Sequence, residues 1–91
     1  MAASPQTARF GNEWGRGAVV RNASDLGALV RLQRKRLALK QLDIAGLGNT
    51  GNRFIVELEA GKPTVQLQKV LDVIELLGLE IVVRPKTAPV L

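Results

Sequence analysis

The chain lacks histidine, cysteine and tyrosine altogether, and among its 91 residues there are only one tryptophan and two phenylalanines. Without histidine or cysteine, zinc sites built from these ligands, disulfides, and His- or Cys-based nucleophilic catalysis are excluded. Carboxylates remain for acid–base chemistry, but they are few, and their helical spacing indicates solvated surface more readily than a paired catalytic site. We therefore expect a protein that is not an enzyme and that uses no cofactor or metal.

Long apolar runs are absent as well. No stretch approaches the ~18 apolar residues of a membrane span, and there is no basic-then-apolar leader. We expect a cytoplasmic protein that is not associated with a membrane. A chain of 91 residues makes one domain of marginal core size, so an oligomer would be a natural way to bury more surface.

The segment from Gln41 to Gly61 has the spacing of two short helices joined by a polar turn. Its apolar residues are Leu42, Ile44, Ala45 and Leu47, and then, after the turn at 48–51, Phe54, Ile55 and Leu58. This spacing predicts a helix-turn-helix with helices at about 41–47 and 52–60. Asn49 tolerates the left-handed conformation that such a turn needs, and the second helix begins with Asn52 and Arg53, whose side chains can contact bases.

Two further helices and two short strands are predicted around this segment. Ser24 is the expected N-cap of a helix that runs to about Leu37, and Thr64 the expected N-cap of a last helix that Gly78 ends. The expected inward residues are Leu26, Leu29, Val30 and Leu37 in the first of these helices, and Leu67, Val70, Leu71, Ile74 and Leu77 in the last.

The β-branched segment 79–84 is predicted to be a strand that pairs with its own copy in a dimer or with a short strand at 18–21. The resulting organisation is a flexible segment 1–23, a DNA-binding and dimerisation domain 24–85 and a flexible tail 86–91.

Charge is unevenly distributed along the chain, whose formal net charge is +5. From residue 31 to residue 62 the basic side chains Arg31, Arg34, Lys35, Arg36, Lys40, Arg53 and Lys62 outnumber the acidic Asp43, Glu57 and Glu59. From residue 64 to residue 83 Lys69 alone opposes Asp72, Glu75 and Glu80. A basic run by itself usually marks only the solvated side of a helix. Its coincidence with a helix-turn-helix pattern favours contact with a phosphate backbone.

Several blocks in register resemble the Xre/Cro-type helix-turn-helix family and, within it, the HipB-type antitoxins. They are Leu39-Lys40-Gln41 with Asp43-Ile44-Ala45, Arg53-Phe54-Ile55, Glu57-Leu58-Glu59 with Gly61-Lys62-Pro63-Thr64, and Leu77-Gly78-Leu79-Glu80-Ile81 running into Val82-Val83-Arg84-Pro85. The resemblance implies a mainly α, four-helix lambda-repressor-like domain with a short C-terminal β-strand that pairs in a homodimer. It also implies a repressor of its own operon at a palindromic operator, and an antitoxin that neutralises a HipA-like Ser/Thr kinase toxin.

The resemblance also assigns roles to individual residues. Asn52, Arg53 and Glu57 would contact bases, although Arg53 could instead clamp a phosphate and Glu57 could lie only at the groove edge. Phosphate contacts would come from Arg34, Lys40, Gln41, Gly51 and Lys62. Arg34 and Glu59 would form an ion pair between helices, and the dimer strand would consist of Leu79, Ile81, Val82, Val83 and Arg84.

Two other functions are compatible with the same pattern. One is a stand-alone repressor of the same family without a toxin partner. The other is a protein-interaction adaptor or an RNA-binding protein that has kept the fold. The RNA reading is disfavoured because Phe10 and Trp14, the aromatic residues outside the expected core, lie in the N-terminal segment and provide no stacking platform.

Overall fold

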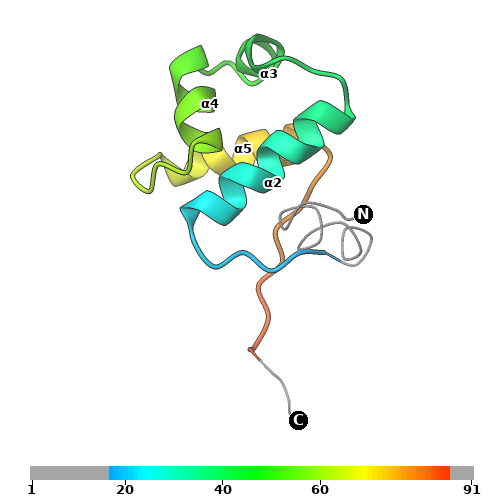
Figure 1. The fold of residues 1–91 in the computed structure, drawn as a ribbon, viewed down its shortest axis with the longest axis vertical. Coiled ribbons are helices and arrows are strands. Elements are labelled where there is room, and N and C mark those ends of the chain that lie inside the picture. The colour runs from blue at the N-terminus through cyan, green and yellow to red at the C-terminus, as the bar shows by residue number, and fades with distance from the viewer. Residues whose placement is uncertain (1–16, 87–91) are drawn as a thin grey trace, which may run out of the picture.

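Residues 17–86 are described by a computed structural model and contain four α-helices: α2 (Ala23–Arg36), α3 (Gln41–Leu47), α4 (Asn52–Glu59) and α5 (Leu67–Leu76). As Figure 1 shows, α3 and α4 lie together at one end of the molecule, and α4 packs against both α2 and α3. The mainly helical, four-helix fold expected from the sequence is confirmed. None of these helices combines the length and apolar character needed to cross a lipid bilayer. The segments expected to be flexible lie largely outside the described residues.

One apolar core joins all four helices. Its buried members are Val30, Ile44, Ala45, Ile55, Leu58, Val70, Val73, Ile74 and Leu77, with Leu26, Leu39, Phe54, Val65 and Leu79 packed around them. The inward stripe of α5 follows i, i+3, i+4 and i+7 from Val70, as a helix with one buried face requires. Leu67 and Leu71, both expected in the core, are instead exposed at 68% and 37%, and Val73 is buried in the middle of the stripe.

The N-caps of two helices differ from those that the sequence predicted. The N-cap of α2 is Asn22 and not Ser24, because the Asn22 Oδ1 atom accepts a hydrogen bond of 2.8 Å from the backbone N–H of Asp25. The N-cap of α5 is Gln66 and not Thr64, and the intervening turn lets Val65 pack against the core.

α2 ends at Arg36, one residue before the predicted end at about Leu37. Leu37, expected in the core, is the C-cap and is 46% exposed.

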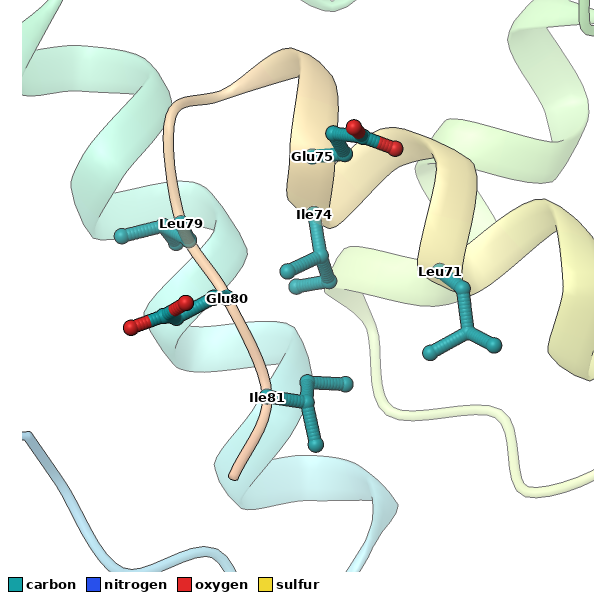
Figure 2. Close-up of a pocket in the computed structure, with 6 residues that line it drawn as sticks. All are labelled: Leu71, Ile74, Glu75, Leu79, Glu80 and Ile81. Carbon is teal, nitrogen blue, oxygen red and sulfur yellow. The ribbon is translucent and has the colours of Figure 1, made fainter.

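The chain leaves α5 through Gly78, at φ +77, and continues as an irregular extended segment, 79–85. In Figures 1 and 2 this segment runs past α2, and the Gln33 Nε2 atom of α2 donates to the Leu77 carbonyl where the segment starts, at 2.9 Å. Residues 17–86 contain no β-strand, so the short strand expected at 18–21 is not formed. A partner for 79–84 within the described part of this chain is therefore excluded.

Candidate nucleic-acid interface

The turn between α3 and α4 is closed by backbone hydrogen bonds. The Gly48 N–H donates to the Ile44 carbonyl at 2.8 Å and the Thr50 N–H to the Ala45 carbonyl at 3.0 Å. Asn49 lies between them at φ +56, so the left-handed conformation expected of this asparagine is confirmed. Because apolar side chains of both helices are buried in the same core, α3, the turn and α4 form one rigid helix-turn-helix unit.

The outer face of α4 presents polar side chains to solvent. Gly51 is the N-cap of α4 and carries no side chain that could hydrogen-bond the helix. Asn52 and Arg53 follow in the first turn, both exposed, and the Arg53 side chain is 88% accessible. Val56, one turn further along the helix, is 41% exposed. An exposed helix with amide and guanidinium groups in its first turn has the shape and the donors to enter a DNA major groove.

A carboxylate at the far end of this face bridges two cations. Glu57 Oε2 lies 3.1 Å from Arg53 Nε, one helical turn back, and 3.3 Å from Lys62 Nζ, beyond the helix end. Hydrogen bonds to Arg53 and Lys62 hold the pKa of Glu57 below its usual value. We call these three residues the Glu57 clasp.

The backbone places Lys62 within reach of the clasp. Gly61 adopts φ +85, its N–H donates to the Leu58 carbonyl at 3.1 Å, and the Lys62 N–H donates to the Glu57 carbonyl at 3.0 Å. This is the Schellman arrangement, which ends a helix and fixes the direction of the chain that follows. The geometry of the clasp therefore depends on Gly61.

A second, buried cluster joins three helices at Glu59. Arg34 of α2 donates from Nε and Nη2 to the two oxygens of Glu59, at 2.6 and 3.0 Å, and from Nη1 to the Leu39 carbonyl at 2.8 Å. Gln41, the first residue of α3, donates from Nε2 to Glu59 Oε1 at 3.1 Å. The two charged side chains are only 10% and 4% accessible. The cluster thus holds α4 at a defined orientation to α2 and α3.

This cluster changes how two expected phosphate ligands are placed. Arg34 points inward, and its guanidinium is engaged by Glu59 and Leu39, so its place is in the helix junction and not at the surface. The amide nitrogen of Gln41 is likewise directed at Glu59. Lys40 is exposed at the N-cap of α3, with its backbone N–H bound by Asp43 Oδ2 at 2.8 Å. Since Gln41 contacts Glu59, Lys40 lies near the C-terminal end of α4, the end from which Lys62 follows.

Sequence reasoning missed a residue on which this geometry rests, Gly27 of α2. A Cβ atom at Gly27 would lie 2.8 Å from the Glu59 carbonyl oxygen and still closer to that of Leu58. The close approach of α2 to α4 therefore requires glycine here. A signal was available, because an isolated glycine inside a helical pattern costs ~1 kcal/mol relative to alanine and usually has a packing reason.

The residues expected in the dimer strand are not brought together with the helix-turn-helix. Leu79 is half-buried against the core, whereas Ile81, Val82, Val83 and Arg84 are exposed along the segment that runs away from α3 and α4 in Figure 1. Val82 is 72% and Val83 93% exposed. Within residues 17–86 nothing covers them.

Four helices around one core, with a helix-turn-helix whose second helix has a solvent-facing polar side, define a helix-turn-helix protein. No family model matches the chain. It is 52% identical over 62 residues to the uncharacterized HTH-type transcriptional regulator y4mF of Sinorhizobium fredii (strain NBRC 101917 / NGR234), an alignment that covers 68% of this chain and 82% of that relative. The chain therefore belongs to the HTH-type transcriptional regulators.

Proposed function

We propose that this protein is a sequence-specific DNA-binding repressor that inserts α4 into the major groove. The observation that carries the proposal is the combination of an exposed first turn, Asn52 and Arg53, with a buried ion pair that holds the same helix in place. Base contacts need side chains positioned to a fraction of an ångström, and a helix held by its neighbours provides that positioning. Such a regulator acts in the cytoplasm, at the nucleoid, and catalyses no reaction.

Individual roles follow from side-chain chemistry. Asn52 is suited to adenine N6 and N7, and Arg53 to guanine O6 and N7 or to a phosphate. Lys40, Lys62 and the backbone amides next to Gln41 and Gly51 would hold phosphates on either side of the groove. Glu57 is suited to a cytosine N4 amino group.

The proposed repressor acts as a homodimer on a palindromic operator. Two recognition helices must reach major grooves one helical turn apart, ~34 Å. The extended segment offers a dimer contact, because its exposed β-branched residues have unpaired backbone groups that a second copy could pair. A hollow of about 390 Å³ lies between α5 and this segment. Figure 2 shows Leu71, Ile74 and Ile81 on its apolar side, which a second copy would cover.

The test of the proposal is binding to the promoter of the protein's own operon. We expect footprint protection of a palindrome there, and Asn52→Ala to weaken binding to that duplex by ~1–3 kcal/mol while changing binding to a scrambled duplex little. Lys62→Ala is the matched control and should weaken both. If Asn52→Ala lost equal affinity for both duplexes, Asn52 would not be a base-contacting residue.

The antitoxin function is the second candidate, and it rests on the resemblance to HipB-type proteins. In its favour, Asp72 and Glu75 are exposed on α5, outside the segment proposed for the dimer contact, and acidic groups suit a partner with a basic patch. Co-expression with a HipA-like kinase from a neighbouring gene should then yield a ternary complex with operator DNA on size exclusion. Glu75→Lys should slow association with the kinase and leave DNA binding intact. Operator binding without any kinase complex would favour the stand-alone repressor.

A further inference from the structure

The Glu57 clasp places a negative charge on the face that is proposed to meet a polyanion. Its carboxylate is 27% accessible, between an 88% accessible Arg53 and a 46% accessible Lys62. The carboxylate neutralises one of the two cations, so the clasp presents one net positive charge to DNA where Arg53 and Lys62 alone would present two. Every DNA sequence offers phosphates, so this loss of charge weakens binding to all of them.

A contribution to folding stability does not explain the presence of the Glu57 carboxylate on this face. Ion pairs between exposed side chains contribute little to folding, because water screens them and two long side chains must be ordered. The helix is already ended by the Gly61 Schellman turn and oriented by the buried Arg34–Glu59 pair. The consequence of Glu57 is therefore electrostatic and directional: it holds the Arg53 and Lys62 head groups at the edge of α4.

We propose that Glu57 is a specificity-determining residue that restrains Arg53 and Lys62 on non-matching DNA and releases them on the operator. This inference rests on the proposed DNA-binding function. On a matching site the Glu57 carboxylate gains a base amino group, cytosine N4, and Arg53 turns to guanine or phosphate. On a non-matching site the carboxylate has no donor other than the two cations, which then remain bound to it and contribute less to phosphate binding.

The experiment compares wild type with Glu57→Gln on operator and scrambled duplexes over a salt series. Glu57→Gln should free one cation for contact with a phosphate. This should steepen the slope of log K against log salt by up to ~0.9, and it should tighten binding to the scrambled duplex by about 3- to 8-fold at ~0.1 M salt. Binding to the operator should tighten less or weaken, so the ratio of operator to scrambled affinity falls. Circular dichroism should give thermal midpoints that differ only slightly between the two proteins, because exposed ion pairs contribute little to stability.

Asp72→Asn on α5 is the charge-matched control. Asp72 is an exposed carboxylate that accepts from Gln68, and its removal raises the net charge by the same amount without touching the clasp. We expect its salt slope to equal that of wild type. An equal effect of Asp72→Asn and Glu57→Gln would reduce the result to net charge and overturn the proposal.

A cycle with the two cations tests whether Glu57 acts through them. In the background of Arg53→Ala with Lys62→Ala, Glu57→Gln should no longer tighten binding to scrambled DNA. A persisting effect would mean that the carboxylate repels phosphate by itself. An unchanged salt slope for Glu57→Gln in the wild-type background would mean that Glu57 does not restrain Arg53 or Lys62. Either result overturns the inference. A wild-type protein that binds neither duplex would instead refute the proposed function.

Discussion

Ala38 occupies a backbone conformation that favours glycine. It follows the C-cap of α2 at φ +59 and is exposed, so no packing compensates the left-handed conformation, which costs a residue with a Cβ ~1–2 kcal/mol. The conformation is held by the turn itself, in which the Ala38 N–H donates to the Lys35 carbonyl at 3.0 Å.

We predict that Ala38→Gly stabilises the protein. Relief of the left-handed strain exceeds the added entropy of the unfolded chain, for an expected net gain of ~0.5–1 kcal/mol in the free energy of unfolding by urea. Asn49→Gly is the control: its φ is +56, but asparagine tolerates this region, so the gain should be smaller. A loss of stability in Ala38→Gly would show that the turn changes in solution.

The pKa of Glu57 should lie below its usual value in the folded protein. Its pKa is lowered by Arg53 first and by Lys62 second, so it lies below that of the unfolded chain. With the folded pKa depressed, the stabilisation from the clasp is present above the unfolded value of ~4.3 and is lost as the pH falls through the folded pKa.

The measurement is an NMR titration of the Glu57 side-chain carboxyl carbon. Arg53→Ala and Lys62→Ala should each raise the midpoint towards that of a free glutamate, whereas Lys69→Ala, which removes a cation placed over the Phe54 ring, should leave it unchanged. A midpoint insensitive to both clasp variants would mean that the ion pairs do not persist in solution.

At the scale of elements, the packing of α2 on α4 depends on Gly27. Gly27→Ala should force the two helices apart, because the new Cβ would meet the carbonyl groups of Leu58 and Glu59. Overpacking of this kind costs ~1–3 kcal/mol, and the gain in helix propensity of ~1 kcal/mol offsets only part of it. We also expect weaker DNA binding, since a displaced α4 loses its fixed orientation.

The control is Gly46→Ala in α3, where a Cβ would meet nothing within 4 Å. This substitution should stabilise the protein by ~1 kcal/mol through helix propensity alone. Urea unfolding of both variants makes the comparison, and a stabilised Gly27→Ala would contradict the close approach of α2 to α4.

At the scale of the whole molecule, the proposed dimer has a preferred strand register. Antiparallel copies of segment 79–84, related by a twofold axis through Val82, would place Glu80 opposite Arg84 of the partner subunit, and this pairing occurs twice. An axis through Glu80 would oppose two carboxylates, which is unfavourable, and an axis through Ile81 would leave both charges without a partner. The charges therefore favour the register centred on Val82.

We predict that Glu80→Arg and Arg84→Glu each weaken the dimer and that the double variant restores it. Cross-strand charge pairs contribute ~0.2–1 kcal/mol each, so two lost pairs and the resulting like-charge contacts should raise the dimer dissociation constant severalfold in sedimentation equilibrium. Asp72→Arg serves as a control, because Asp72 is exposed on α5 and lies outside both the strand and the hollow. If the double variant remained as weak as the single ones, the strands would pair in another register or not at all.

Local signals in the sequence determined much of this fold. The bounds of α3 are as predicted, α4 ends one residue earlier than predicted, and Asn49, Gly61 and Gly78 adopt the positive φ values that their turns require. Capping, turn chemistry and helical periodicity act over a few residues, so they predict local structure without knowledge of the rest of the chain.

The Arg34–Glu59 ion pair was expected from the family resemblance, and the structure contains it. Only the tertiary structure showed that Gln41, 18 residues from Glu59, joins the same pair and that the Arg34 guanidinium is buried, which turns both side chains away from the phosphate contacts suggested for them. Gly27 is needed only because α4 crosses α2 at that point. Such contacts depend on how separate helices pack, which no local pattern specifies. Segment 79–84 shows the same limit, since a strand requires a partner, and residues 17–86 of a single copy provide none.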